Sequence, residues 1–543
     1  MTCQRGAFRH ANCARAHGAG AAASGKTPLA ARANREASGR SGLVTRFRRF
    51  VQLTVVNVMI QSSAHKYEQG GRQMLESIVR SSLMLAAAAT PLLVACGGGT
   101  ASNPAPITPA QCSGSSCANQ GPPSSAPTAT ALCPAAADIA ANTYLGGAGS
   151  GEVVSLNIDP TKMTYKLTFL ASPIPVAASS VQNTRAGLTI TGAVQHPPAG
   201  SLPTAAQVTC AFQLQAGTGT INGSTYTTAY NAGNPPTIYV GFGVAGGGIP
   251  GATVNIDGDT TANLLFSGVA PRTFDFYPFI GFSSVSTSLA DLKGSYNALL
   301  YHILPSSSFA PAAKVTQEQY DASGNCSVPG GATNTSCATA AKVWTASTSG
   351  NYFDSADAPQ IETPTPLPFP LSLGNNVIVS RQGGVGHLIL GKLNGAIVPV
   401  VVRTGYVNET LSLSNQIAVD DESGIALLAP ATTLTSGAFD GSYIGADSNF
   451  AYTATLINGQ QAGFLKPSTM TTQSQFTLDY TQTHPGLIGV TDTQGKAGNL
   501  IAVSGLYGIF INGEENGGVT ASSANSATPN QPYFGVGALI QPQ

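Results

Sequence analysis

Seven Asn-Gly or Asp-Gly dipeptides are spread from residue 222 to residue 516, and no sustained amphipathic helix separates them. Each dipeptide supplies the positive φ that a two-residue β-hairpin turn requires. Residues 165–170 alternate apolar and polar side chains, as a half-buried strand does. These patterns predict a mainly β chain, built as an antiparallel β-sandwich or as up-and-down barrel-like domains, with few short helices and a disordered N-terminal region.

Charge is unevenly distributed along the chain. Residues 1–73 contain twelve of the 25 Lys and Arg residues and two of the 25 acids, and residues 74–95 contain one residue of each sign. The 12 basic and 22 acidic residues that remain give the part from Cys96 onward a formal charge of −10. A body with this charge and without basic patches is not expected to bind nucleic acid or to be held to anionic lipid by electrostatics.

Residues 74–95 have the organisation of a secretory signal peptide. A short segment ending in Arg80 precedes an apolar stretch at 81–92. This stretch is too short for a bilayer-spanning helix, which needs about 20 residues, but it suits the apolar core of a signal peptide. Leu93-Val94-Ala95-Cys96 and three glycines follow. The small Ala95 lets a peptidase approach the backbone, and the Cys96 thiol can carry a lipid.

Leu93-Val94-Ala95-Cys96 resembles the lipobox of bacterial lipoproteins. The body also vaguely resembles uncharacterised Gram-negative envelope lipoproteins of unknown function that have Gly-Gly-Gly after the cysteine. The resemblance implies cleavage before Cys96, a diacylglycerol on its sulfur and an acyl chain on the new amino terminus. It thereby implies a membrane partner held through Cys96. Gly97, in place of Asp, implies the outer membrane, with the body facing the periplasm or the cell surface.

Residues 1–73 are rich in Arg, Ala and Gly and have no periodic apolar pattern before about residue 50. We interpret them as an untranslated or disordered leader, with translation starting at Met74. The alternative is a twin-arginine signal at Arg48-Arg49-Phe50, although three polar residues interrupt the apolar run at 51–60 behind it.

Six cysteines follow Cys96, and an even number in an oxidising compartment indicates three disulfides, with fifteen connectivities open. Ten residues of flexible, Gly-, Asn- and Thr-rich sequence separate Cys326 from Cys337, so we expect these two to pair. Cys112 and Cys117 are similarly close, which leaves Cys133 for Cys210, although Cys112 and Cys117 could stay open in a flexible segment. Zinc-type Cys–His spacing is absent, and we predict no metal site and no cofactor.

Composition and a weak internal repeat divide the chain. Residues 97–131 carry no charge and consist mostly of small residues and Pro, which predicts a flexible tether at 96–132. Leu-Lys-Gly-Ser-Tyr at 292–296 resembles Phe-Asp-Gly-Ser-Tyr at 439–443. After the leader (1–73) and the signal peptide (74–95), we therefore expect an N-terminal β domain at 133–286, a β module with an insertion at 287–437 and a related C-terminal module at 438–543.

Several patterns that resemble functional motifs have simpler structural interpretations. The Gly-x-Gly-x-x-Gly sequence at 241–246 is followed by Gly247-Gly248-Ile249-Pro250, which does not open a helix, so we expect a glycine-rich β-turn there and no dinucleotide site. Asp420-Asp421-Glu422 and Glu514-Glu515 stand beside turn sequences, so we expect solvated hairpin tips and neither paired catalytic acids nor a calcium site.

Aromatic and histidine side chains are interpreted in the same way. Residues 274–282 contain five aromatics, for which we expect core packing on both faces; an exposed platform for sugar rings or an apolar ligand is the alternative. Pro278 indicates an edge strand. The four histidines after Cys96 are expected to be structural; they are His196, His302, His387 and His484.

The sequence therefore predicts a cell-envelope lipoprotein with a non-enzymatic binding, adhesive or structural role. An unidentified envelope protein or a glycan is the partner that this role would require. The alternative is an envelope hydrolase that acts on glycan or lipid. Such an enzyme needs a nucleophile or an acid near a base in a pocket, and the sequence contains no Gly-x-Ser-x-Gly motif. No residue is assigned a catalytic role.

Overall fold

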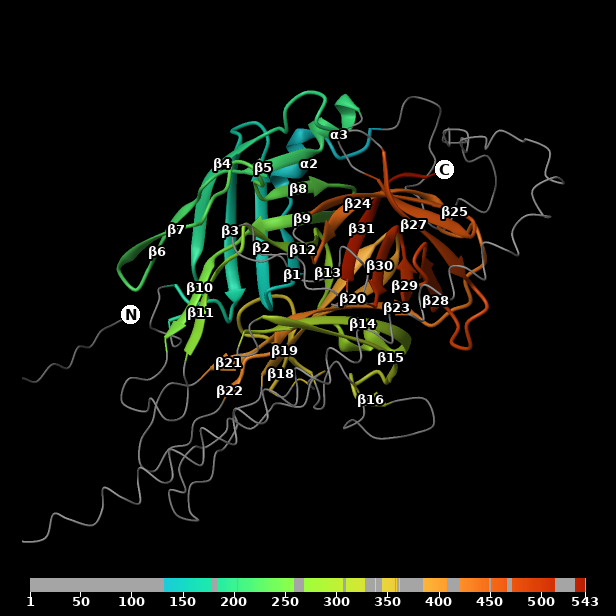
Figure 1. Cartoon of the computed structure of the whole chain (residues 1–543). Coiled ribbons are helices and arrows are strands. Elements are labelled where there is room, and N and C mark those ends of the chain that lie inside the picture. The colour runs from blue at the N-terminus through green and yellow to red at the C-terminus, as the bar shows by residue number, and fades with distance from the viewer. Residues whose placement is uncertain are drawn as a thin grey trace, which may run out of the picture. The chain divides into compact units, whose positions relative to one another are not determined.

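A computed structural model describes the body of the chain as an almost entirely antiparallel β protein (Figure 1). The mainly β prediction is therefore confirmed. In the described residues the helices are short: α2 (Ala136–Ala141), α3 (Ala205–Thr209) and the 3-10 helix η2 (Leu289–Leu292). Described are residues 131–542 except for 177–182, 203, 258–267, 306–308, 328–336, 338–343, 357, 359–360, 362–383, 408–418, 449–450, 466–470 and 513–532. Cys96, Cys112, Cys117 and the Glu514-Glu515 pair lie outside the described residues.

The first sheet contains ten strands, and an additional pairing between β3 and β4 closes eight of them into a ring. We call this ring the first barrel; it is coloured teal to green in Figure 1. The hairpin of β6 (Thr218–Ile221) and β7 (Ser224–Thr227) extends from β4, and β10 (Thr253–Asp257) pairs with β11 (Gly268–Thr273) beside it. The strands of the ring are, in spatial order, β3 (Thr164–Ala171), β2 (Glu152–Asp159), β1 (Tyr144–Ala148), β12 (Phe276–Phe282), β9 (Val244–Pro250), β8 (Thr237–Val240), β5 (Ala211–Leu214) and β4 (Thr189–Gln195).

The second sheet contains nine strands, and we call it the middle sheet. β13 (Val285–Ser286) continues directly from the first barrel and pairs with β19. The small pair β21 (Tyr406–Val407) and β22 (Val419–Asp420) leads into β23. The remaining strands are, in spatial order, β16 (Cys326–Ser327), β15 (Ala310–Tyr320), β14 (Gly294–Leu304), β23 (Ser423–Pro430), β20 (Ala396–Thr404), β19 (Val385–Leu393), β18 (Phe353–Ser355) and β17 (Thr345–Ala346).

The C-terminal strands form a closed barrel in strict sequence order, which we call the second barrel; it is orange to red in Figure 1. The ring closes where β24 pairs with β31. Its strands are β24 (Gly441–Asp447), β25 (Tyr452–Asn458), β26 (Gln461–Leu465), β27 (Thr472–Asp479), β28 (Ile488–Asp492), β29 (Ala497–Val503), β30 (Leu506–Ile511) and β31 (Tyr533–Pro542).

Two-residue turns explain much of this connectivity. Asn222-Gly223 and Asn394-Gly395 both have positive φ and join adjacent strands, as their sequence predicts. Ser504-Gly505 has the same backbone conformation between β29 and β30, although its first residue is neither Asn nor Asp. Asp440 is different, because Gly441 begins β24 and the Asp440 carboxylate accepts the Gly459 N–H at 2.8 Å. The hairpin-turn interpretation of Asp440-Gly441 is therefore wrong.

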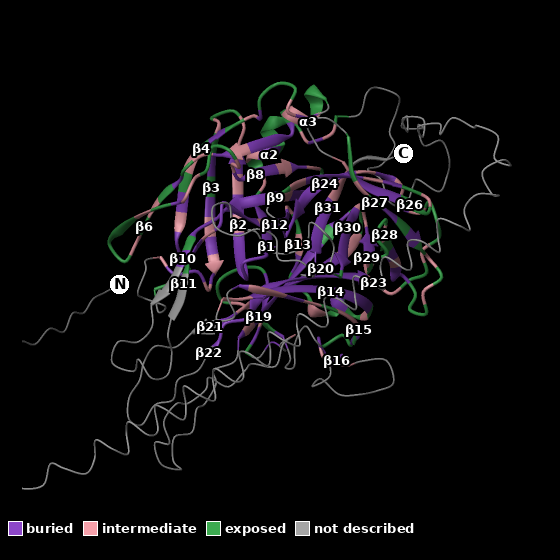
Figure 2. Ribbon diagram, in the orientation of Figure 1, coloured by how far each residue is buried: buried purple, intermediate pink, exposed green. Residues whose placement is uncertain are grey.

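Alternation decides which side chains fill the first barrel. Tyr165, Leu167 and Phe169 of β3 are buried, whereas Thr164 and Lys166, which alternate with them, are exposed. This is the period of two that the sequence predicts for this segment. Figure 2 shows the consequence across the ring, where long stretches of buried strand are interrupted by partly exposed positions.

The central strands of the middle sheet, β14, β23, β20 and β19, are buried on both faces and show no alternation. Leu427 and Val400 belong to the large core shared with both barrels, whereas Leu428 and Val401 belong to a separate core on the opposite face. Trp344 and the cysteines of the insertion fill that second core. Because each face meets a packed layer, a continuous apolar run such as that of β20 can be accommodated.

Most of the aromatic run at 274–282 forms β12, which begins at Phe276, and the aromatic side chains of the run are all buried, so the core-packing interpretation is confirmed. The edge-strand expectation from Pro278 is wrong, because β12 pairs with β1 on one side and with β9 on the other. Pro278 is tolerated because the β1 pairing ends at Ala148, opposite Phe279. The missing N–H therefore lies just beyond the end of that ladder.

Candidate functional site

The structure contains disulfides between Cys133 and Cys210 and between Cys326 and Cys337, the pairs expected from the sequence. The first joins the segment before α2 to the end of α3 across 77 residues, with α-carbons 5.7 Å apart. The second closes the loop after β16, with α-carbons 6.2 Å apart. Each bond therefore attaches a residue outside the strands, Cys133 or Cys337, to the rest of the fold.

The acidic triplet at 420–422 is not a solvated hairpin tip, which corrects the sequence interpretation. Asp420, Asp421 and Glu422 are only 4%, 7% and 2% exposed. Burial of three acids is costly unless partners compensate their charge. The partners come from strands far away in the sequence, which is why the local turn composition gave the wrong answer.

Arg403 and His302 are the compensating groups. Arg403 Nη2 donates to both carboxylate oxygens of Asp420, at 2.8 and 2.7 Å. Glu422 accepts from His302 Nδ1 at 2.6 Å and from the backbone N–H of Ile361 at 2.8 Å. We call these four side chains (His302, Arg403, Asp420 and Glu422) the acidic cluster.

Protonation in the acidic cluster follows from this geometry. Burial lowers the pKa of His302, and its hydrogen bond to Glu422 opposes the shift only in part. Burial alone would raise the pKa of Glu422, but the hydrogen bond from His302, the N–H of Ile361 and the charge of Arg403 together lower it. We conclude that Glu422 is ionised and that a neutral His302 donates to it through Nδ1.

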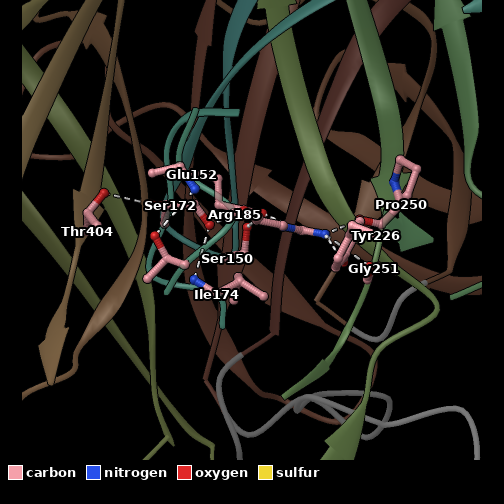
Figure 3. Close-up of polar contacts among 12 residues, drawn as sticks. Ser150, Glu152, Ser172, Ile174, Arg185, Tyr226, Pro250, Gly251 and Thr404 are labelled. Carbon is pink, nitrogen blue, oxygen red and sulfur yellow. Dashed lines mark hydrogen bonds and ion pairs between the residues drawn. The ribbon is translucent and has the colours of Figure 1, made fainter. Parts of the chain in front are cut away.

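A second buried ion pair lies in the first barrel (Figure 3). Arg185 and Glu152 are both fully buried, and two guanidinium nitrogens donate to the two carboxylate oxygens at 2.6 and 2.5 Å. Ser150 and Ser172 also donate to the carboxylate, at 2.7 and 2.5 Å. Burial alone would lower the pKa of Arg185, but the charge of Glu152 raises it above its ordinary value.

The third guanidinium nitrogen of Arg185, Nη1, contacts the backbone near the end of β9. It donates to the carbonyl oxygens of Pro250 and Gly251 at the end of β9, at 3.3 and 3.1 Å. The guanidinium carbon lies 4.1 Å from the centre of the Phe169 ring. Arg185 therefore satisfies both its charge and its donors inside the protein, with little capacity left for an external ligand.

The turn between β1 and β2, directly before Glu152, lies against Arg403 of the acidic cluster. Gly151 in that turn has φ +82°, and a Cβ there would lie 2.4 Å from the carbonyl oxygen of Arg403. Thr404, next to Arg403, donates to the Gly151 carbonyl at 2.7 Å and appears at the left of Figure 3. Gly151 thus lies between the Glu152–Arg185 pair and the acidic cluster, where the first barrel packs on the middle sheet.

Thr404 also ends a carboxylate–imidazole–hydroxyl relay. His387 Nδ1 lies 2.6 Å from Asp354 Oδ1, and His387 Nε2 lies 3.0 Å from Thr404 Oγ1. Three groups in this order can activate a hydroxyl as a nucleophile. A hydroxyl has a single proton, however, so Thr404 cannot donate to His387 while it donates to Gly151. The relay was not identified from the sequence because its members come from three strands.

A cleft of about 690 Å³ lies where the first barrel meets the loop between β17 and β18. Its floor includes Leu145, Ser155 and Thr168 from neighbouring strands of the barrel. The connection at 283–285 and the loop at 349–351 form its walls. None of its lining residues is charged.

The other sequence candidates have structural positions. The glycines at 241–246 turn β8 into β9, as expected for a β-turn, and Gly243 has φ +81°. His196 Nδ1 lies 2.9 Å from the carbonyl oxygen of Ala211, and His484 sits in the loop between β27 and β28. In the described part of the chain, no group of three or more His, Cys, Asp and Glu side chains is arranged to hold a metal ion. No helix among the described residues has the length and apolarity to cross a membrane.

Among solved structures, the chain is similar to two mutants of the vaccine antigen Transferrin Binding Protein B from Haemophilus parasuis Hp5. The sequence identities are 10% and 8%, and the TM-scores are 0.22 and 0.19. The matches cover 72% of this chain and 66% of each antigen chain, just under two thirds of the antigen's length. TM-scores this low transfer neither a fold nor a function.

Sequence comparison gives a firmer result. No curated protein sequence matches the chain. A family model covers residues 164–538, which is more than half of the chain, and the chain therefore belongs to the family "Protein of unknown function (DUF2957)".

Proposed function

We propose that this chain is a lipid-anchored, non-enzymatic binding protein of the outer cell envelope. The observation that carries the proposal is the pair of disulfides in the body that follows the lipobox-like Leu93-Val94-Ala95-Cys96. Structural disulfides persist in oxidising compartments outside the cytosol. Cys133, the first cysteine of the folded body, comes directly after the uncharged tether, so the anchor, the spacer and the exported domain stand in consecutive order.

Internal pairing of charge favours binding over catalysis. Glu152 and Arg185 neutralise each other inside the first barrel, as do Asp420 and Arg403 in the acidic cluster. The cleft at the first barrel is open, and none of its lining residues is charged. Such a surface suits recognition through hydrogen bonds better than chemistry that needs a charged group.

Fractionation of cells tests the anchor. We expect Cys96→Ala to remain an unlipidated precursor that no longer incorporates a labelled fatty acid and no longer fractionates with outer-membrane lipids. Cys112→Ala is the matched control, because it removes a tether cysteine outside the lipobox, and it should behave like the wild type. Equal membrane recovery of both variants would overturn the proposal.

The domain division and the translation start are part of the same proposal. We propose that residues 133–286, 287–437 and 438–543 act as three β modules and that translation begins at Met74. A tag placed before Met1 should then never appear in the cell. A tagged precursor of full length would contradict this start and would reopen the twin-arginine alternative.

An envelope hydrolase is the second candidate, and the relay of Asp354, His387 and Thr404 favours it. The hydroxyl-to-carbonyl bond from Thr404 to Gly151 counts against it, because the proton that His387 would remove points elsewhere. Hydrolysis of nitrophenyl butyrate decides between the two. We expect no turnover above a His387→Ala control. Turnover that is lost in His387→Ala and Thr404→Val but retained in Thr404→Ser would favour the hydrolase.

A further inference from the structure

The cleft is built on a row of side chains that crosses four strands of the first barrel. Phe282 pairs with Leu145, Leu145 with Ser155, and Ser155 with Thr168. Residues directly opposite each other on adjacent strands project from the same face. The row therefore lies on the outer surface of the barrel, where each strand holds its side chain at a fixed position.

The walls come from segments that are held against this row. Gly350 lies close enough to Leu170 that a Cβ would be 3.2 Å from the leucine Cδ1. Val285, on the other wall, is fixed by the pairing of β13 with β19. Clefts between packed units are common ligand sites, and a volume of about 690 Å³ lies within the usual range for them.

The chemistry of the lining selects a class of ligand. Eight of the lining side chains end in a hydroxyl or an amide and four are larger apolar groups. The polar ones are Asn142, Thr143, Ser155, Thr168, Ser283, Ser284, Ser349 and Asn351, and the apolar ones are Leu145, Leu170, Phe282 and Val285.

Both extremes of ligand polarity are disfavoured by this lining. A charged ligand would lose hydration without gaining a counter-charge. A purely apolar ligand would cover hydroxyls without satisfying them. Hydroxyl and amide groups both donate and accept, so they match a neutral ligand that carries many hydroxyls of its own.

Several of the hydroxyls are available for such a ligand. Among the described residues, the side chains of Ser155, Ser283 and Ser284 have no hydrogen-bond partner. Thr168 shares its hydroxyl with Thr189 at 2.9 Å, which fixes its rotamer and leaves acceptor capacity. Leu145 and Leu170 offer apolar surface between these groups, which suits the C–H face of a sugar ring.

We infer that this cleft binds a short, neutral oligosaccharide. This inference rests on the proposed binding function and names the ligand class for it. The hydroxyls of the cleft would pair with the ligand's hydroxyls, and the leucines would contact its ring faces.

Titration calorimetry on the full chain in detergent tests the inference with defined probes. Maltohexaose, cellohexaose and chitohexaose are the neutral probes, and hexagalacturonate is the charged counterpart. At least one neutral probe should bind with a Kd of about 1 mM or tighter, and hexagalacturonate should not bind. Failure of all three neutral probes, or binding of hexagalacturonate alone, overturns the inference.

Variants assign any binding to the cleft. Ser155→Tyr fills the floor and should weaken binding by about tenfold or more, and Ser284→Tyr should do the same from the exposed wall. Thr191→Tyr is the matched control, since Thr191 is exposed on β4 of the same barrel outside the lining, and its affinity should stay within about twofold of the wild type. Melting temperatures verify folding, and Ser284→Tyr replaces Ser155→Tyr if the latter unfolds. Equal affinities for the wild type and the folded cleft variant overturn the inference.

Membrane fractionation separates this inference from the function on which it rests. Loss of the membrane anchor together with intact sugar binding would contradict the lipoprotein proposal alone. Normal anchoring without sugar binding would contradict the ligand assignment alone.

Discussion

The two barrels of this chain reach closure by different routes. In the second barrel, each strand from β24 to β31 pairs with the next in the sequence, and only the final β24–β31 pairing is long-range. In the first barrel, β12 is placed between β1 and β9, and β5 pairs with β8 across an intervening hairpin. The first ring therefore depends much more on contacts between distant segments.

Polar groups are used differently in the two rings. In the second barrel, the Thr455 and Tyr507 hydroxyls form a buried contact between uncharged groups, with their oxygens 2.6 Å apart. The first barrel has the fully buried pair of Glu152 and Arg185 and also the long-range disulfide from Cys133 to Cys210. Misplaced strands would leave one of these charges buried and alone, which is strongly unfavourable. The comparison suggests, as a hypothesis, that paired charges and a crosslink specify the ring whose strand order is not local.

The largest expected effect comes from unpairing the buried charges. Glu152→Gln removes one charge and leaves the guanidinium of Arg185 buried without a counter-ion, which should cost about 3–5 kcal/mol in the free energy of unfolding. Thr455→Val is the counterpart in the second barrel and should cost about 1 kcal/mol, since it removes an uncharged hydrogen bond. Urea unfolding measures both.

Hydrogen exchange shows which strands lose stability in Glu152→Gln. Glu152→Gln should increase exchange in β1 to β3 before it affects β27 to β30. The double variant Glu152→Gln with Arg185→Met should recover stability, because no charge is then left unpaired. Equal stability losses for Glu152→Gln and Thr455→Val would break the distinction between the barrels.

The two disulfides are expected to stabilise the chain by different amounts, because they close loops of different length. The Cys133–Cys210 bond closes a loop of 77 residues in sequence separation, for which the entropy model assigns about 4 kcal/mol. The Cys326–Cys337 bond spans 11 residues, for which the same model assigns about 3 kcal/mol. Replacing each pair with alanines should therefore lower the unfolding free energy more for the first pair. The opposite order in urea titrations would show that local packing around Trp344 outweighs loop length.

The same division between local and long-range features separates what the sequence predicts from what it does not. Alternation at 165–170 and the turns at Asn222 and Asn394 are local, so the β class and these hairpins follow from the sequence. Asp420 and Glu422 were misassigned because Arg403 and His302 reach them only through the sheet. The row from Phe282 to Thr168 depends on strand register, which no short window contains. The placement of β12 between β1 and β9 is hidden for the same reason.

The acidic cluster predicts how stability depends on pH. Both His302 and Glu422 have folded-state pKa values below their unfolded ones, so the unfolded chain binds more protons. Stability is then fully present above the unfolded pKa of histidine, about 6.5, and decreases as the pH falls below it. Unfolding free energies measured between about pH 7.5 and pH 5 should show this decline.

His302→Asn is the matched variant for this prediction. The asparagine amide can still donate to Glu422, but it does not titrate. Its stability should fall less steeply between the same pH limits. Identical pH profiles for wild type and His302→Asn would assign the decline in stability to other groups. If hydrogen exchange in the second barrel does not change as the pH falls, the loss of stability lies in the middle sheet.

The smallest expected effect concerns the contact between the barrels themselves. Tyr452 of the second barrel stacks on Phe276 of the first, with ring centres 4.8 Å apart. Its hydroxyl donates to the Pro235 carbonyl at 3.0 Å and accepts from the Thr237 N–H at 2.5 Å. Burial raises the pKa of Tyr452 well above its ordinary value, so the hydroxyl keeps its proton at neutral pH.

Tyr452→Phe retains the stacked ring and removes both hydrogen bonds, which should cost about 1 kcal/mol. If each barrel is stabilised mainly by its own closure, Tyr452→Phe should lower the melting temperature by a few degrees and leave exchange inside both rings unchanged. Increased exchange throughout β24 to β31 would instead show that the second barrel depends on its contact with the first barrel for stability. That result would contradict the contrast between the two rings.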